Sequence, residues 1–150
     1  MIGDSAGGNL AAAVSLRARD EGEFYIPRQI LIYPATYYDH SESSPFASVM
    51  ENGSEYLLTS RRICEYIDLY KRDDEDLKNP YFAPLLAKDF SDQPDTLIIT
   101  AEFDPLRMRG SLWQKAAGGG EPGNYLPDAG RLARLLWAGH RLYSCASAHA

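Results

Sequence analysis

The chain opens on the pattern Gly-x-Ser-x-Gly, in which Ser5 stands between Gly3 and Gly7. In this pattern the serine occupies a sharp, strained turn between a strand and a helix, and the two glycines allow the close backbone approach that the turn needs. The turn exposes the serine hydroxyl, and the backbone N–H groups that follow it face the point where an oxyanion would form. The spacing therefore predicts a serine nucleophile. The alternative is a serine that caps an alanine-rich helix.

A carboxylate with a candidate role follows a second element of the chain. The β-branched apolar run from Leu97 to Thr100 predicts a buried strand, and Asp104 lies just past its end, before Pro105. In open α/β sheets, functional side chains gather beyond the carboxyl ends of the strands. This position makes Asp104 a candidate functional residue. The alternative is an aspartate that caps a turn.

Together the two motifs resemble those of the hormone-sensitive-lipase-like branch of the α/β-hydrolases, which contains many bacterial carboxylesterases. The resemblance rests on Asp-Ser-Ala-Gly-Gly-Asn at residues 4–9 and on Asp-Pro-Leu-Arg at residues 104–107, and it covers about residues 2–107. The order of the motifs along the chain also fits the order Ser, Asp, His of these enzymes. The resemblance implies hydrolysis of a small-molecule carboxylic ester with no cofactor and no metal.

The resemblance also implies a role for each matching residue. Ser5 would attack the ester carbonyl, a histidine would take the serine proton, and Asp104 would orient that histidine. The backbone N–H of Ala6 would bind the oxyanion, together with glycine N–H groups from a loop ahead of Met1. Hydrolysis of an amide stays open as an alternative, because a fold does not fix the reaction.

The histidine of such a triad is missing from its expected place. The family carries it after the aspartate in a His-Gly-aromatic turn, at a spacing where this chain has Arg134. The three histidines of the chain are His40, His140 and His149, and each is interpreted as solvated or incidental. Triad members act as a unit, so the chain as written is expected to be inactive. The alternative to an esterase is a non-catalytic fragment or binding remnant.

The composition of the chain changes after Arg107. From Met108 onward there is no Ile, Val or Phe, and the excess of acidic over basic residues reverses. Strands draw on β-branched and aromatic residues, so we expect this tail to supply no further buried strand.

A frameshift in the coding sequence would explain the change, and a natural divergent tail is the alternative. Shifted codons permit the sequences GEAYGKKLREAGN and YRMPDALHGYFG, with the histidine codon straddling Ala133 and Arg134.

The elements between the motifs must position these groups, and they alternate as in an α/β protein. Residues 6 to about 19 predict a helix that ends near Gly22, and residues 29–33 predict a buried strand that Pro34 stops. Together with the strand before Asp104, they predict a mostly parallel sheet with flanking helices.

A polar, turn-rich segment interrupts this alternation. Residues 35–76 are predicted to leave the sheet as a lid-like excursion, within which Thr59 or Ser60 caps a helix. The apolar face of that helix predicts ordinary packing rather than substrate recognition; it consists of Ile63, Tyr66, Ile67 and Tyr70.

The fold predicted is therefore a partial α/β-hydrolase fold. Only Met1 and Ile2 precede the elbow, so the strand leading into it, and with it the N-terminal half of the sheet, is expected to be missing. The catalytic domain is expected to cover residues 1–107, and an aberrant tail of low order to cover residues 108–150.

Charge and composition exclude several partners and leave others open. The net charge is −6 without a basic patch, which argues against nucleic acid and anionic membranes. No apolar stretch is long enough to span a membrane and no signal peptide is visible, so the cytoplasm is the expected location. Cys64 and Cys145 are too few for a disulfide framework or a metal site. A small-molecule ester is the expected partner, and the sequence leaves the oligomeric state open.

Overall fold

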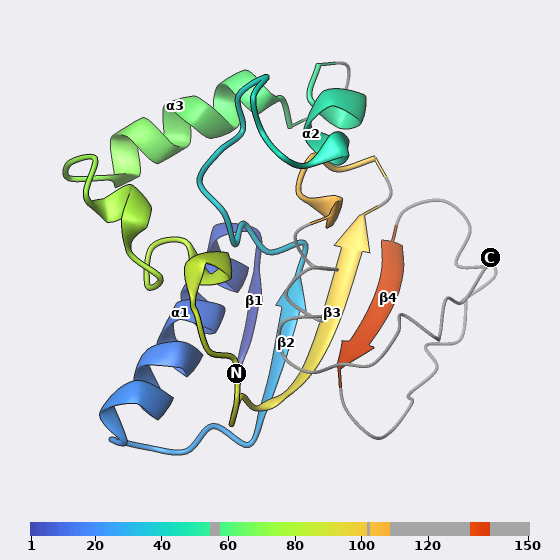
Figure 1. The fold of residues 1–150 in the computed structure, drawn as a ribbon. Coiled ribbons are helices and arrows are strands. Elements are labelled where there is room, and N and C mark those ends of the chain that lie inside the picture. The colour runs from blue at the N-terminus through green and yellow to red at the C-terminus, as the bar shows by residue number, and fades with distance from the viewer. Residues whose placement is uncertain (55–57, 102, 109–132, 139–150) are drawn as a thin grey trace, which may run out of the picture.

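A four-stranded sheet with the strand order β1-β2-β3-β4 carries the described part of the chain (Figure 1). The computed structural model describes residues 1–54, 58–101, 103–108 and 133–138. The strands are β1 (Ile2–Asp4), β2 (Arg28–Ile32), β3 (Asp95–Ala101) and β4 (Ala133–Ala138). β1, β2 and β3 run parallel, and β4 pairs antiparallel with β3. The predicted α/β architecture with a mostly parallel sheet is confirmed.

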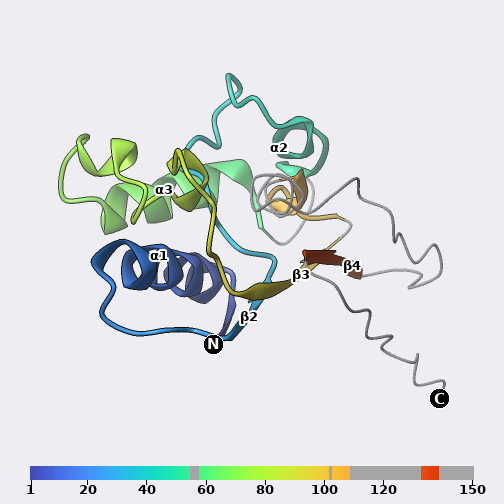
Figure 2. The same cartoon turned by 60° about the horizontal axis from the view of Figure 1, so that its bottom comes forward.

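The helix α1 (Ala6–Glu21) covers one face of the sheet, as Figure 2 shows. The side chains of β2 and β3 alternate between the two faces, so Leu31 and Ile98 point toward the helix and are fully buried. They pack against the small side chains of Ala11 and Ala12 and against Leu16. This core cluster fixes the distance between α1 and the strands.

Two of the predicted elements agree closely with the structure. The predicted helix becomes α1, which ends at Glu21 with Gly22 in the left-handed region at φ 63°. The predicted strand at residues 29–33 becomes β2, which ends one residue before Tyr33. Both were predictable because periodicity and helix-ending residues are local signals.

The expectation that the strand ahead of the elbow is missing is wrong for its last three residues. Ile2, Gly3 and Asp4 form β1, because parallel pairing with β2 places them opposite Ile30, Leu31 and Ile32. A strand this short forms because it pairs with a neighbouring strand, and not because its own residues favour strand structure.

The sequence predicted no further buried strand in the tail, and the structure places one strand there, β4, beside β3. β4 lies in that tail and runs along the edge of β3, where it pairs with main-chain groups that an edge strand would otherwise present to water. Composition alone did not predict it, because β4 has no β-branched residue. The rest of the predicted tail, apart from Met108, lies outside the described residues.

The excursion at residues 35–76 contains the α-helices α2 (Ala47–Asn52) and α3 (Ser60–Tyr70), and the short 3-10 helices η1 (Asp76–Lys78) and η2 (Pro84–Leu86) lie between α3 and β3. Thr59 caps α3 as predicted, since its hydroxyl accepts the Arg62 N–H at 3.3 Å. The predicted packing of the apolar face of α3 agrees with the structure at Ile63, which is buried, and at Tyr70, whose ring stacks on Phe82 at 5.0 Å between centroids. Tyr66 is 57% exposed. No helix within the described ranges combines the length and the apolar character needed to cross a membrane.

Candidate active site

Ser5 occupies the turn between β1 and α1, and its backbone is strained. It has φ 50° and ψ −117°, a region that residues with a Cβ rarely adopt. Three hydrogen bonds hold this conformation: the Ser5 N–H donates to the Ile32 carbonyl at 2.9 Å, and the Ser5 carbonyl accepts the Asn9 and Ala35 N–H groups at 3.1 and 3.2 Å. The predicted strand–turn–helix context of Ser5 is therefore present, with the loop after β2 fastened to it.

The glycines around Ser5 differ in how much space they have. A Cβ on Gly3 would collide with the Gly7 carbonyl and lie 2.9 Å from the Gly8 nitrogen. A Cβ on Gly8 would lie 2.9 Å from the Cβ of Pro34. A Cβ on Gly7 would meet only Asp4 Oδ1 at 3.7 Å, an ordinary contact. The expectation that both glycines of the pattern allow a close backbone approach is thus correct for Gly3 and wrong for Gly7. The second position at which a neighbouring residue comes too close for a Cβ is Gly8.

Ala6 is the first residue of α1, directly after the turn. The first four N–H groups of a helix have no intrahelical acceptor, and the helix dipole places partial positive charge there. An oxyanion near Ser5 would meet this end of α1. The geometry is therefore compatible with the predicted role of the Ala6 N–H, which stays a prediction.

Asn9 connects three segments beneath the elbow. Its side chain is 7% exposed, and its amide nitrogen donates to the Ala35 carbonyl at 2.7 Å and to the Phe82 carbonyl at 2.8 Å. These bonds hold the loop after β2 and the segment before β3 against the start of α1. Asn9 belongs to the elbow motif, but its role is not visible in the sequence because both of its acceptors are distant along the chain.

Asp104 lies beyond the carboxyl end of β3, in a turn. Its Oδ1 accepts the Leu106 N–H at 2.9 Å, and its carbonyl accepts the Arg107 N–H at 3.1 Å. The turn-capping alternative is therefore correct as a description of this carboxylate. Capping does not exclude the orientation of a base, because a carboxylate has two oxygens and several acceptor positions.

The sheet topology brings Ser5 and Asp104 to the same edge of the sheet. Ser5 follows β1 and Asp104 follows β3, and β2 lies between these two strands with all three parallel (Figure 1). The carboxyl ends of parallel strands meet at one edge, which is where sheets of this kind place their functional groups.

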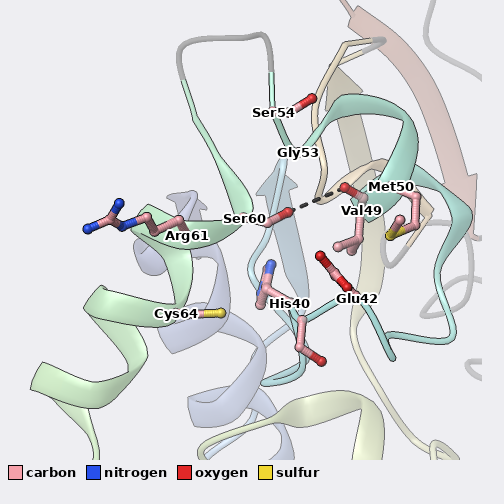
Figure 3. Close-up of a pocket in the computed structure, with 10 residues that line it drawn as sticks. His40, Glu42, Val49, Met50, Gly53, Ser54, Ser60, Arg61 and Cys64 are labelled. Atoms are coloured by element: carbon pink, nitrogen blue, oxygen red, sulfur yellow. Dashed lines mark hydrogen bonds between the residues drawn. The ribbon is translucent and has the colours of Figure 1, made fainter.

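The one histidine that the structure describes, His40, lies away from Ser5 and Asp104. His40 is 1% exposed and its Nε2 lies 3.3 Å from the Tyr37 carbonyl, so of the two interpretations, solvated or incidental, the first is wrong and the second stays a prediction. It borders a hollow of about 460 Å³ in the excursion, together with Cys64 of α3 (Figure 3). Neither Ser5 nor Asp104 lines that hollow. His140 and His149 lie outside the described residues.

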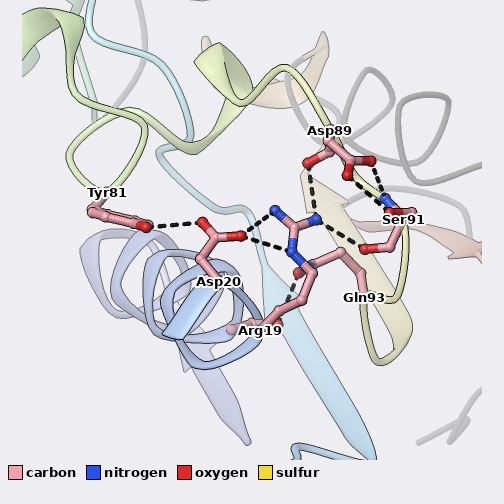
Figure 4. A network of polar contacts seen from close by, with 7 residues as sticks. Arg19, Asp20, Tyr81, Asp89, Ser91 and Gln93 are labelled. Carbon is pink, nitrogen blue, oxygen red and sulfur yellow. Dashed lines mark hydrogen bonds and ion pairs between the residues drawn. The ribbon is translucent and has the colours of Figure 1, made fainter. Parts of the chain in front are cut away.

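A polar network away from the elbow fastens the far end of α1 (Figure 4). The Arg19 guanidinium donates to the carbonyls of Asp89 and Ser91 at 3.0 and 2.8 Å and to the carboxylate of Asp20 at 2.6 Å. The Tyr81 hydroxyl donates to the same carboxylate at 2.8 Å. The hydrogen bonds from Arg19, and then from Tyr81, hold the pKa of Asp20 below its ordinary value, and the bond to Asp20 raises the pKa of Tyr81.

Comparison with known sequences agrees with this geometry. Residues 1–121 match the model of a protein family described as alpha/beta hydrolase fold. The arylesterase of Saccharolobus solfataricus is 39% identical over 113 residues, which cover 75% of this chain and 35% of that protein. The carboxylic ester hydrolase LipN of Mycobacterium tuberculosis is 42% identical over 119 residues, which cover 76% of this chain and 31% of that protein.

Solved structures give the same result. A hyperthermophilic esterase from the archaeon Pyrobaculum calidifontis has a TM-score of 0.69 and 41% sequence identity, over 78% of this chain and 38% of that one. The chain spans about a third of the length of the curated relatives named above.

Proposed function

Because the chain belongs to the α/β-hydrolases, in the branch of the hormone-sensitive-lipase-like carboxylesterases, we propose that it is a serine hydrolase of small carboxylic esters. The observation that carries the proposal is the turn at Ser5, where a strained serine stands between a parallel strand and a helix N-terminus. Backbone strain of this kind persists at functional sites because the surrounding structure over-determines it.

In the proposed reaction, Ser5 Oγ forms a bond to the ester carbonyl carbon while its proton passes to a histidine base. The carbonyl oxygen becomes an oxyanion, which the Ala6 N–H stabilises at the start of α1. The protonated histidine gives its proton to the leaving alcohol oxygen as the C–O bond breaks, which leaves an acyl group on Ser5. Water, whose proton passes to the same base, then attacks the acyl carbon, and the acid leaves as the proton returns to Ser5 Oγ. Asp104 holds the base in the correct orientation and stabilises its positive charge.

A specific observation favours the second candidate, a non-catalytic chain. The position at the spacing expected for the base is Arg134, and His40 is buried in the excursion against the Tyr37 carbonyl. Without a base the Ser5 hydroxyl keeps its proton, and a triad that lacks one member loses most of its rate advantage.

Covalent labelling separates the two candidates. The purified chain is treated with a fluorophosphonate, which labels activated serines, and the hydrolysis of a nitrophenyl acetate is followed in parallel. A working site gives stoichiometric labelling and hydrolysis that Ser5→Ala abolishes. The control Ser43→Ala removes an exposed loop hydroxyl instead and leaves both unchanged. If the chain is neither labelled nor able to hydrolyse the ester, the esterase proposal fails and the non-catalytic alternative is supported.

Sequencing of the source DNA across the codons for residues 104–139 gives an independent test. A restored frame with His-Gly-aromatic after Asp104 would identify the missing base. An unchanged frame would favour the non-catalytic chain.

A further inference from the structure

The short helix α2 lies against the turn that carries Asp104, although the two are about fifty residues apart in sequence. Ser48, Glu51 and Asn52 of α2 make the contacts. They are spaced at i, i+3 and i+4, so they lie on one face of the helix. That face is polar, and all of its bonding partners named below belong to residues 104–108.

Ser48 is at the centre of this contact. It is fully buried, and its hydroxyl donates to the Pro105 carbonyl at 2.8 Å. The same oxygen accepts the Met108 N–H at 3.4 Å. One side chain therefore holds both ends of the turn that follows Asp104.

Two further contacts accompany that of Ser48. Asn52 is 5% exposed, and its amide donates to the Asp104 carbonyl at 3.4 Å, a weaker bond. Glu51 forms an ion pair with Arg107 at 2.7 Å, nearer the surface. The backbone from the Asp104 carbonyl to the Met108 N–H is thereby connected to α2.

We propose that Ser48 is a positioning residue for Asp104, assisted by Asn52 and by the Glu51–Arg107 pair. This inference rests on the proposed function, in which Asp104 orients the base. The carboxylate direction is set by the turn, since Oδ1 accepts the Leu106 N–H of that turn. Catalytic groups need support that holds them within about 0.5 Å of their productive geometry. A carbonyl held by a buried hydroxyl provides such support.

The proposal gives α2 a function that ordinary packing would not require. A helix that served only to fill space would present apolar side chains to the sheet. Here Ser48 and Asn52 are both buried and both donate to main-chain carbonyls. Loss of Ser48 leaves the buried Pro105 carbonyl without that partner, and loss of Asn52 removes a donor from the part-buried Asp104 carbonyl, so the turn then opens more often.

The test measures the turn directly and does not depend on turnover. Amide hydrogen exchange at Leu106 and Arg107, whose N–H groups donate to Asp104, is followed by NMR in the full chain. Ser48→Ala is expected to speed this exchange about tenfold. The control Ser44→Ala removes a hydroxyl–carbonyl bond of 3.0 Å in the same excursion, to Asp39, and should leave exchange at the turn unchanged. Ser48→Thr keeps the hydroxyl and should restore slow exchange.

Kinetics supply the second readout. In a chain that hydrolyses nitrophenyl acetate, Ser48→Ala is expected to lower kcat about tenfold with KM unchanged, because Asp104 acts on the transition state and not on substrate binding. An unchanged kcat overturns the proposal, as does exchange that responds equally to Ser48→Ala and Ser44→Ala. If the parent chain hydrolyses no ester, the proposed function fails, and the exchange measurement still decides whether α2 holds the turn.

A surface variant covers the case in which Ser48→Ala does not fold. Glu51→Gln removes only the charge from the ion pair with Arg107, and the Glu51 side chain is 54% exposed. Exchange at Arg107 should then rise about twofold, the effect of a partly exposed pair. If the exchange rate does not change, the contribution of this pair is refuted.

Discussion

The sharpest prediction concerns the glycines of the elbow, which are equivalent in the sequence pattern but not in space. Gly3→Ala should destabilise the chain strongly, and Gly7→Ala should not. A Cβ on Gly3 would enter the space of the Gly7 carbonyl and come within 2.9 Å of the Gly8 nitrogen. Both atoms belong to the backbone of the first turn of α1, so no side-chain rotation can relieve the collision.

The magnitudes follow from these contacts. Added atoms in a packed site cost about 1–3 kcal/mol, and the upper end applies here because backbone must move. At Gly7 the nearest atom to a new Cβ is Asp4 Oδ1, at 3.7 Å. Alanine is favoured over glycine inside a helix by up to about 1 kcal/mol, so Gly7→Ala should be neutral or stabilising. Gly8→Ala should fall between them, since its Cβ would meet Pro34 Cβ at 2.9 Å.

Urea unfolding followed by far-UV circular dichroism measures these differences. The urea concentration at the midpoint should be highest for Gly7→Ala, lower for Gly8→Ala and lowest for Gly3→Ala. The free energies of unfolding of Gly7→Ala and Gly3→Ala should differ by about 3 kcal/mol. The Gly7 variant is the matched control, because it adds the same methyl group to the same motif. Equal midpoints for Gly3→Ala and Gly7→Ala would refute the packing argument.

Three further variants test the surroundings of the site. Ser5→Gly should be more stable than Ser5→Ala by about 1 kcal/mol in the same urea assay, because glycine adopts a positive φ without strain; equal stability would mean that the turn is relaxed. Asn9→Ala should cost about 2 kcal/mol, since it leaves two carbonyls beneath the elbow without their amide donor, and a thermal scan that shows no loss would contradict this. Asp20→Asn should cost less than about 1 kcal/mol at pH 6, because the carboxylate is partly exposed. Hydrogen bonds from Arg19 and Tyr81 lower the pKa of Asp20, so its contribution is present above its unfolded pKa of about 3.9 and is lost as the pH falls through the lower folded value. The difference between Asp20→Asn and the parent should therefore narrow as the pH falls below about 4, and a difference that stays constant through that fall would exclude this origin.

The elements that the sequence predicted are those with local signals. The small-residue run after Ser5 predicted α1, and Gly22 marked its end. The apolar run before Asp104 predicted β3. In each case the residues that determine the element lie inside it or next to it.

The features that sequence analysis missed depend on contacts between distant residues. α2 has only six residues and no strong pattern, and its Ser48 acquires a role only through a carbonyl at residue 105. β4 forms against the edge of β3, so its existence depends on a partner about forty residues away. The burial of His40 likewise depends on how the excursion folds back, which its polar composition does not reveal.

Two strained residues connect the fold to the candidate site. Ser5 and Tyr33 both have positive φ, at 50° and 35°, and each directly follows the last residue of a strand. The Ser5 N–H donates to Ile32 at the end of β2, and the Tyr33 N–H donates to Ile99 in β3 at 2.6 Å. Each strained residue thus extends the hydrogen bonding of one strand onto the next before the chain turns away.

The parallel pairing of three strands therefore imposes the backbone strain at Ser5, which is half-buried. A non-glycine residue keeps a positive φ only where its neighbours leave no alternative, and here those neighbours are the ends of adjacent strands. The elbow sequence without β2 beside it would relax, because water would replace the Ile32 carbonyl as acceptor of the Ser5 N–H and would not fix its position. The geometry at Ser5 is for this reason a property of the sheet, and a change that loosens β2 from β3 should reach this candidate nucleophile through Tyr33 and Ile32.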